Sequence, residues 1–269
     1  MNSDDEEINP VTMLLLNTDN NQLTKNGKTT ELAPLPVQDK TYHLTSINST
    51  LTIRQLPSQG LSFQLWPAAE TFVKLFDTYK PSNTDPFSVT VTKCANDRKP
   101  IRILELGSGT GIVGITAAAI LGGEVTVTDL PHVLPNMEYN VELNREVVVS
   151  GGGEVRVARL SWGEVGDMEV IGRGYDLVIG SDVVYHDNLY EPLIQTLKFL
   201  LLGSGDQGEK EGERVFLMGH LRRWKKESSF FKKVRKMFRV DVVHEDGPSS
   251  VSRTGVVVYR FARKDAVFR

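Results

Sequence analysis

Hydrophobic and polar positions follow two different rhythms along this chain. Between residues 40 and 53 they alternate one by one in two short runs, Tyr42–Leu44 and Leu51–Ile53, with a polar turn between the runs. Alternation on both sides of a turn predicts a β-hairpin. From Trp66 onward the apolar residues instead recur every three to four positions until Pro81. This spacing predicts a helix.

Strand-like and helix-like segments alternate from residue 101 to the C-terminal region. We expect strands at 101–106, 124–128, 154–160, 175–180 and 214–218, helices at 111–121, 135–145 and 189–202, a helix carrying Phe230, Phe231, Val234 and Phe238, and a closing antiparallel pair at 240–243 and 255–261. Such alternation is typical of a mostly parallel sheet with crossover helices. The segments 81–100 and 203–213 are expected to be extra loops.

One α/β domain accounts for all of these elements. The chain has 269 residues, of which 40% are hydrophobic and 24% charged, and this composition is sufficient for a sizeable core. Residues 1–38 are polar, rich in asparagine and acidic, and we expect them to form a flexible extension. Residues 39–269 then form a Rossmann-like domain with seven strands, a final antiparallel pair and an N-terminal β-hairpin.

Charge and cysteine content argue against several classes of protein. The formal net charge of −3 gives no global attraction to nucleic acid, so we expect no nucleic-acid partner. The single cysteine and five scattered histidines predict neither a disulfide scaffold nor a metal site. The acidic N-terminus differs from a signal peptide, and no apolar run is long enough to cross a membrane. We expect a monomer that is cytoplasmic or nuclear and has no membrane contact.

The strand at 101–106 runs into a glycine-rich turn, Gly107-Ser108-Gly109-Thr110-Gly111, which leads directly into a helix. Such a turn presents backbone N–H groups and a helix N-terminus to a polar or anionic ligand. Asp129 ends the next strand, where a carboxylate can accept hydrogen bonds from both hydroxyls of a ribose. The turn and Asp129 together predict a cofactor that contains adenosine.

Two adenosine cofactors fit this pattern. Residues 109–114 match the dinucleotide fingerprint G-x-G-x-x-G and would indicate an NAD(P)-dependent oxidoreductase. However, the glycines begin earlier, at Gly107, and Glu105 stands just before them. A carboxylate at Glu105 would repel a pyrophosphate but could hold the amino group and sulfonium of S-adenosylmethionine. A methyltransferase is therefore favoured, with the oxidoreductase and a catalytically silent binding module as alternatives.

Candidate chemistry also follows the later strands. Asp182 and Tyr185 come after the strand at 175–180, at the sheet edge where ligands bind in open α/β sheets. A lysine amine must lose a proton before it attacks a methyl group, so Asp182 could orient the ammonium and Tyr185 could line its channel. Trp162 could stack on an adenine, and Trp66 could cover a sulfonium. Helix capping by Asp182 and ordinary packing of the three aromatic residues are the alternatives.

A basic stretch begins at Arg222-Arg223-Trp224-Lys225-Lys226 and continues to Lys236. Its charges alternate with Phe230, Phe231 and Val234 at helical spacing, which favours the solvated face of an amphipathic helix. A docking surface for an acidic protein partner is the alternative.

Five motifs together resemble those of the eukaryotic methyltransferase family 16, the methyltransferase-like protein 21 group of seven-strand protein-lysine methyltransferases. They are Leu65-Trp66-Pro67-Ala68-Ala69, Leu104 to Gly111, Thr128-Asp129-Leu130, Leu160-Ser161-Trp162-Gly163 and Ser181-Asp182-Val183-Val184-Tyr185. The resemblance covers roughly residues 40–265 and implies a methyltransferase fold, S-adenosylmethionine as donor, and a protein substrate such as a chaperone, an ATPase or a translation factor.

The resemblance and the motifs define the expected site. The cofactor-binding residues are expected to be Trp66, Glu105, Gly107, Ser108, Gly109, Asp129, Leu130, Trp162 and Ser181, and the catalytic residues Asp182 and Tyr185. Ser181 departs from the alanine that many members of the family carry before the aspartate. This departure and the two extra loops leave the chemistry intact but do not identify the substrate.

Overall fold

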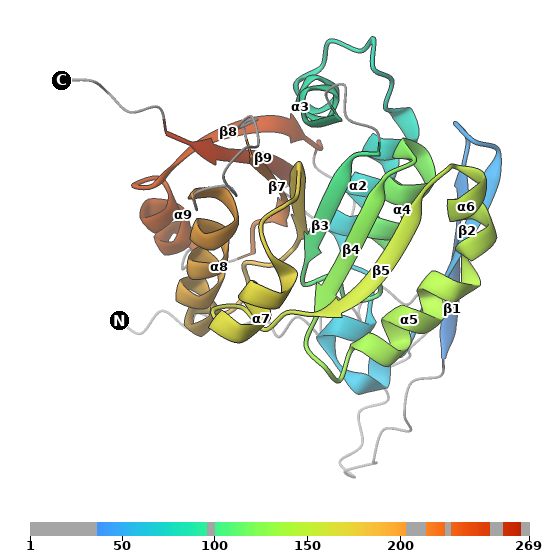
Figure 1. The fold of residues 1–269 in the computed structure, drawn as a ribbon, viewed down its shortest axis with the longest axis horizontal. Helices are drawn as coiled ribbons and strands as arrows, with labels where there is room; N and C mark the ends of the chain where they lie inside the picture. Colours follow the sequence, from blue (N-terminus) through green and yellow to red (C-terminus); the bar gives the residue numbers. More distant parts are fainter. Residues whose placement is uncertain (1–36, 96–99, 203–213, 224–226, 248–254, 265–269) are drawn as a thin grey trace, which may run out of the picture.

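A seven-stranded sheet forms the centre of the computed structural model, which describes residues 37–95, 100–202, 214–223, 227–247 and 255–264 (Figure 1). The strands, in spatial order, are β5 (Glu154–Arg159), β4 (Glu124–Asp129), β3 (Arg102–Leu106), β6 (Leu177–Ser181), β7 (Val215–Leu221), β9 (Val256–Arg263) and β8 (Phe238–Glu245). The first five are parallel to one another, whereas β9 runs antiparallel to both of its neighbours. The described part of the chain thus confirms the predicted mostly parallel sheet and closing antiparallel pair.

Helices cover both faces of this sheet. On one face lie α2 (Pro67–Thr78), α4 (Ile112–Leu121), α5 (Leu134–Leu143) and α6 (Arg145–Ser150), and on the other lie α7 (Val165–Ile171), α8 (Tyr190–Leu202) and α9 (Ser228–Val234) (Figure 1). Neighbouring residues of β3 serve opposite faces, because Ile103 packs in the core under α4 and Leu104 in the core under α8. Burial on both faces explains why the central strands β3, β6 and β7 are nearly continuous apolar runs rather than alternating patterns.

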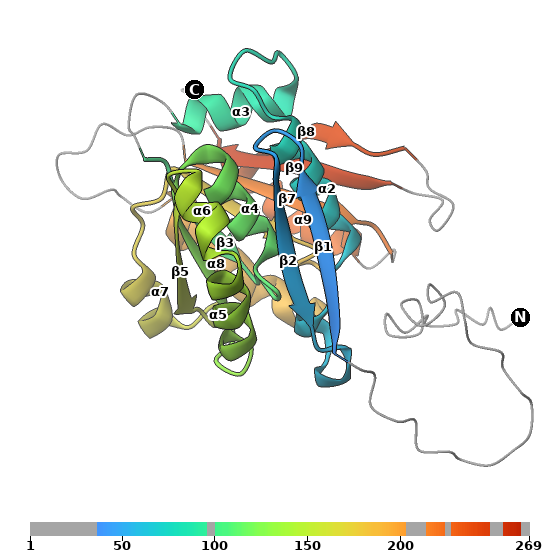
Figure 2. The same ribbon diagram turned by 90° about the vertical axis from the view of Figure 1, so that its right-hand side faces the viewer.

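The N-terminal hairpin, β1 (Gln38–Leu44) and β2 (Ser49–Gln55), confirms the prediction from its alternating pattern. It lies against α5 and α6 on one flank of the molecule (Figure 2). Asn140 and Asn144 hold it there: each accepts a hydrogen bond from a β2 backbone N–H and donates one to a β2 carbonyl. Asn140 also donates to the carbonyl of Thr110, at 3.0 Å. The hairpin is therefore tied to the glycine-rich turn.

The structure corrects the expectation that residues 81–100 form a loop, since α3 spans Pro86–Ala95. Asp85 caps this helix through a 2.9 Å hydrogen bond from the backbone N–H of Ser88 to its carboxylate. Phe87 and Val91, one helical turn apart, are buried in the core. The low helix propensity of the valines and threonines between Pro86 and Ala95 masked this pattern.

Two further expectations differ from the structure. Phe238 was assigned to the helix that follows Glu227, but it is the first residue of β8 and is fully buried, while α9 ends at Val234. The short helices α6 and α7 had no counterpart in the prediction.

The expected flexible extension at residues 1–38 lies outside the described residues, apart from its last two positions. The structure begins β1 at the second of these, Gln38. The expected loop at 203–213 also lies outside the described residues.

Candidate active site

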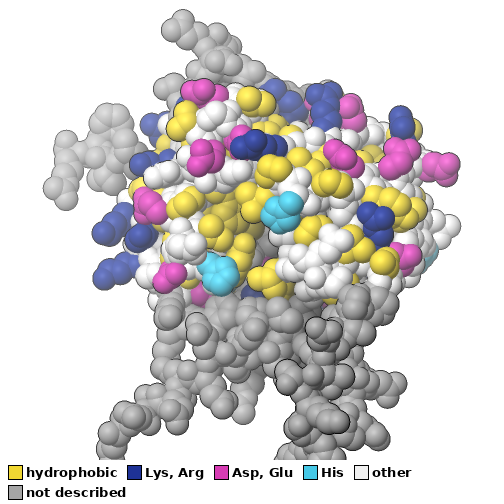
Figure 3. All heavy atoms as spheres, turned by 90° about the horizontal axis from the view of Figure 1, so that it is seen from below, with side chains coloured by type: hydrophobic (Ala, Val, Ile, Leu, Met, Phe, Trp, Pro, Cys, Tyr) yellow, Lys and Arg dark blue, Asp and Glu magenta, His cyan; other side chains and the backbone are white. Residues whose placement is uncertain are grey.

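A cavity opens at the carboxyl edge of the parallel strands, where the chain leaves β3, β4, β5 and β6. Figure 3 views the molecule from this edge, where hydrophobic side chains gather around a hollow in the surface. The residues that line the cavity include nearly all of the predicted site: Trp66, Gly107, Ser108, Gly109, Asp129, Leu130, Trp162, Ser181, Asp182 and Tyr185. Motifs separated by more than a hundred positions therefore meet at the place that the α/β topology predicts.

The glycine-rich turn forms the floor of this cavity. Its glycines Gly107, Gly109 and Gly111 have φ angles of 60°, 56° and 84°, in the left-handed region that side chains disfavour. A Cβ atom on Gly107 would lie 2.9 Å from the ring of Trp162, and one on Gly109 would lie 2.9 Å from the carbonyl oxygen of Ser62. Both the backbone conformation and the close neighbours therefore require glycine at these two positions.

Asp129 links the turn to the end of β4. Its Oδ2 accepts a hydrogen bond from the backbone N–H of Gly109, and its Oδ1 accepts one from that of Leu130, both at 2.8 Å. Burial raises the pKa of this carboxyl, an effect that the two N–H donors partly offset. A carboxylate offers about four lone-pair sites, so two remain for a ligand in the cavity.

Glu105 does not take the position that the sequence suggested. Its side chain is fully buried beneath the turn, is not part of the described cavity lining, and accepts a 2.8 Å hydrogen bond at Oε2 from the backbone N–H of Gly114. Its Oε1 has no partner among the described residues. Burial raises the pKa of Glu105 to about 8. The expected direct contact with the cofactor is thus replaced by a role in holding the start of α4 against β3.

Aromatic side chains form two walls of the cavity. Trp162 packs over Gly107, and Trp66 donates a 3.0 Å hydrogen bond from Nε1 to the carbonyl of Leu61. Tyr185 also lines the cavity, and burial raises the pKa of its phenol, so this group stays protonated at neutral pH. The cavity thus has an apolar interior with a few polar groups at fixed places.

Asp182 is more constrained than the sequence indicated. Its backbone is left-handed, with φ at 53°. Its carboxylate accepts hydrogen bonds from the backbone N–H groups of Ala68 and Leu221, at 3.3 and 2.9 Å. It also forms a two-pronged ion pair with Arg223, at 3.1 and 3.2 Å. The expected role of Asp182, to orient a substrate ammonium, is not supported by a carboxylate with this many partners.

Arg223 is a cavity residue that the sequence interpretation missed. It belongs to the basic stretch assigned to a solvated helix face, yet its side chain is 10% exposed and its guanidinium lies 5.2 Å from the centre of the Trp66 ring. It stands after β7 and before α9, so the helical periodicity invoked for the stretch does not include it. Nothing in the local sequence separates Arg223 from its exposed neighbour Arg222. Residues 224–226 of the stretch lie outside the described structure.

Several cavity-lining residues had no local signal in the sequence. They come from the segment before α2 and from the start of α8: Leu61, Ser62, Gln64, Leu189 and Pro192. Most of these side chains are apolar or small, and only the fold brings them over the glycine-rich turn.

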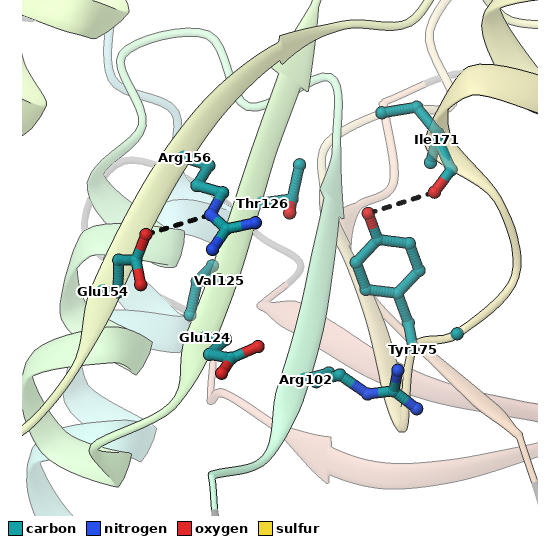
Figure 4. Close-up of a pocket in the computed structure, with 9 residues that line it drawn as sticks. Arg102, Glu124, Val125, Thr126, Glu154, Arg156, Ile171 and Tyr175 are labelled. Carbon is teal, nitrogen blue, oxygen red and sulfur yellow. Dashed lines mark hydrogen bonds and ion pairs between the residues drawn. The ribbon is translucent and has the colours of Figure 1, made fainter.

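A second cavity of similar size lies at the opposite end of the strands. Its volume is about 250 Å³, against about 240 Å³ for the first, so size does not distinguish them. Figure 4 shows its mixed charges, including the Glu154–Arg156 ion pair, near the starts of β3, β4 and β5. Ligands in open α/β sheets bind at the carboxyl ends of strands. The first cavity is therefore the candidate active site.

Within the described ranges, no group of three or more His, Cys, Asp or Glu side chains is arranged to hold a metal ion. Among the helices of those same ranges, none combines the length and apolar character that a membrane span requires.

Comparison with known proteins identifies the family. A family model described as lysine methyltransferase matches residues 45–237. Protein N-lysine methyltransferase METTL21A of Danio rerio is 37% identical over 164 residues, covering 61% of this chain and 67% of the relative. EEF1A lysine methyltransferase 3 of Mus musculus is 33% identical over 194 residues, covering 72% and 71%. METTL21A of Mus musculus is 30% identical over 206 residues, covering 76% and 81%.

These matches confirm the resemblance drawn from the five motifs and contradict the oxidoreductase alternative. The seven-stranded topology and the cavity at its carboxyl edge agree with them. The chain belongs to the lysine methyltransferase family and is a protein-lysine N-methyltransferase of the METTL21 group.

Proposed function

We propose that the cavity at the carboxyl edge binds S-adenosylmethionine and brings its methyl group to a lysine amine of a protein substrate. Use of this donor follows from membership of the methyltransferase family. The observation that supports the location is convergence: the glycine-rich turn, Asp129, Trp162 and Tyr185 come from four different segments and line one cavity.

The residues present fit the parts of this cofactor. The two free lone-pair sites of Asp129 suit the two ribose hydroxyls. Trp162 and Leu130 offer apolar surface for an adenine ring. The left-handed turn at Gly107 and Gly109 carries no side chains, so its backbone can approach the cofactor closely on the floor of the cavity. Trp66 is the aromatic wall available to the sulfonium end.

The proposed reaction depends more on alignment of the two reactants than on covalent participation of protein side chains. S-adenosylmethionine supplies an electrophilic methyl group, which a lysine attacks as a neutral amine after its proton has left to solvent. The apolar walls and the protonated phenol of Tyr185 line the cavity, and a lysine side chain that enters it would displace water from the reacting groups. Holding the two reactants in line and removing solvent from them are the contributions proposed for this chain.

The translation factor EEF1A is the first substrate to test, because one relative at 33% identity is named as its lysine methyltransferase. A chaperone or an ATPase is the next candidate class. We further propose that the protein acts as a monomer in the cytoplasm or nucleus and that neither nucleic acid nor a membrane is its partner.

The test is transfer of a labelled methyl group from S-adenosylmethionine to purified EEF1A, with the modified residue identified by mass spectrometry. We expect label on a lysine with the wild-type enzyme and loss of that label with Asp129→Asn. Asp187→Asn, which alters an exposed carboxylate at the same sheet edge, serves as the matched control and should remain active. Label on a different protein of a cell lysate would reject EEF1A alone, whereas label on nucleic acid would reject the proposed function.

A further inference from the structure

The hydrogen-bonding capacity of Asp182 is filled by the protein itself. In the described part of the chain, its two oxygens accept hydrogen bonds from the N–H groups of Ala68 and Leu221 and from both terminal nitrogens of Arg223. A carboxylate has about four such sites. The Asp182 side chain is 3% exposed and that of Arg223 is 10% exposed, so water competes little with this pair.

Arg223 is fixed at its main chain as well as at its side chain. The backbone N–H of Arg223 donates to both oxygens of Glu227, at 3.3 and 3.2 Å. Glu227 is itself buried and pairs with Nε2 of buried His220 at 3.0 Å. These hydrogen bonds fix the segment that carries the guanidinium, so the side chain of Arg223 is held in place at both ends. It connects the end of β6 with the start of α2, at the wall that contains Trp66.

This pairing changes the charge that the cavity presents. An unpaired carboxylate beside a lysine amine would favour the ammonium form, which cannot attack a methyl group. It would also attract the sulfonium of the donor more strongly than the neutral sulfur of the product. A two-pronged guanidinium cancels both effects while leaving the carboxylate in place as an anchor. The Asp182–Arg223 pair is close to neutral as a unit.

We propose that Arg223 is a positioning residue of this reaction, which holds Asp182 as an anchor between β6, β7 and α2 and keeps the cavity electrically neutral at the reacting end. Asp182 then acts through the wall that it assembles, not by contact with the substrate lysine. The proposal rests on the proposed function, because it assumes that the cavity holds S-adenosylmethionine.

The experiment compares the affinities of S-adenosylmethionine and S-adenosylhomocysteine by calorimetric titration of the full-length protein. These two ligands differ by the methyl group and its positive charge, so their affinity ratio reports the local field. Arg223→Met unmasks a negative charge and should shift the ratio about threefold or more toward S-adenosylmethionine. Asp182→Asn unmasks a positive charge and should shift it in the opposite direction by a similar factor. The double variant should return to the wild-type ratio.

Two controls keep the test decisive. Arg222→Met removes an exposed arginine next in the chain and should leave the ratio unchanged. Arg223→Lys keeps the positive charge and should therefore keep the wild-type affinity ratio. If Arg223→Met does not fold, Asp182→Asn still tests the direction in which the ratio shifts. Equal ratios in the wild type and both charge-unmasking variants would overturn the proposal. Failure of the wild type to bind either ligand would instead reject the cofactor site in the proposed function.

Discussion

Two carboxylates at the ends of neighbouring strands show how the surroundings decide what a residue does. Glu105 and Asp129 stand within the same pair of strands, and the sequence suggested that both contact the cofactor. Glu105 points beneath the turn and holds the N–H of Gly114, whereas Asp129 lines the cavity with lone pairs to spare. The difference comes from position along the strand, because Glu105 lies inside β3, beneath the start of α4, whereas Asp129 is the last residue of β4, at the edge where the cavity opens.

Burial of Glu105 predicts an unusual dependence of stability on pH. Its pKa is about 8 in the folded protein, while an exposed glutamate in the unfolded chain has a pKa of about 4.3. Between these values the unfolded chain gives up the proton and the folded protein keeps it, so the unfolded state gains stability as pH rises. Glu105 should therefore reduce the free energy of unfolding progressively from pH 5 to pH 8, by up to about 4 kcal/mol.

Urea unfolding of the wild type and Glu105→Gln at pH 5, 6, 7 and 8 measures this effect. The glutamine can still accept a hydrogen bond from Gly114 but cannot ionise. We expect the stability of the variant relative to the wild type to rise with pH, because other titrating groups are common to both proteins. A difference that stays constant from pH 5 to pH 8 would contradict the assignment of Glu105 as a buried, high-pKa carboxyl.

At the scale of elements, the hairpin and the glycine-rich turn behave as one unit. Three asparagines of the α5 region, Asn136, Asn140 and Asn144, are spaced four residues apart, so they face the same side of the helix, and all are buried. Their amides pair with the backbone of β2 much as a neighbouring strand would. Asn140 extends this pairing to Thr110 and so supports the cofactor turn from below.

Loss of Asn140 should therefore affect stability and binding together. Asn140→Ala removes the partner of the Arg54 backbone N–H and of the Thr110 carbonyl, and each such group costs about 1–3 kcal/mol. We expect a loss of about 2–4 kcal/mol in urea unfolding, together with weaker binding of S-adenosylhomocysteine. Asn188→Ala, at an exposed position, is the control. If the Asn140 variant were as stable as the wild type, water would be replacing the hydrogen bonds of the Asn140 amide without cost, and the prediction would be wrong.

At the scale of the whole molecule, the cavity forms where independent parts of the fold meet. The glycine-rich turn after β3 supplies its floor, the segment before α2 and the loop after β5 supply its walls, and the segment after β7 supplies Arg223. A ligand that fills this space contacts all of these parts at once. Binding should therefore stabilise the domain as one unit.

Thermal unfolding with added ligand measures this coupling. At a concentration about 100 times its Kd, S-adenosylhomocysteine should add about 2.7 kcal/mol, which raises Tm by about 5–10 °C for a domain of this size. NADH at the same concentration should give no shift, and Asp129→Asn should abolish the shift caused by S-adenosylhomocysteine. A larger shift with NADH would indicate that the turn at Gly109 to Gly114 binds a dinucleotide after all.

Much of this protein was determined by the sequence alone, because local physical rules control it. Strands buried on both faces must be continuous apolar runs, a hairpin must alternate, and a strand that turns into a helix beside a ligand needs glycines such as Gly107 and Gly109. The sheet, the hairpin, the main helices and the predicted site residues that line the cavity followed from these rules. Helix α3 was not predicted because valine and threonine favour strands as readily as helices.

Only the tertiary structure decided how the charged groups pair. Arg223 and Asp182 are separated by 41 positions, and no local pattern selects Arg223 over Arg222 as the partner. Likewise, Glu105 is covered by the start of α4 while Asp129 reaches the cavity, and this difference depends on how α4 packs on β3. Coulombic pairing and burial act through space, so they become visible once the strands and helices have been assembled. The sequence thus determined the chemistry present at the site, and the fold determined which groups face the ligand and which hold the site together.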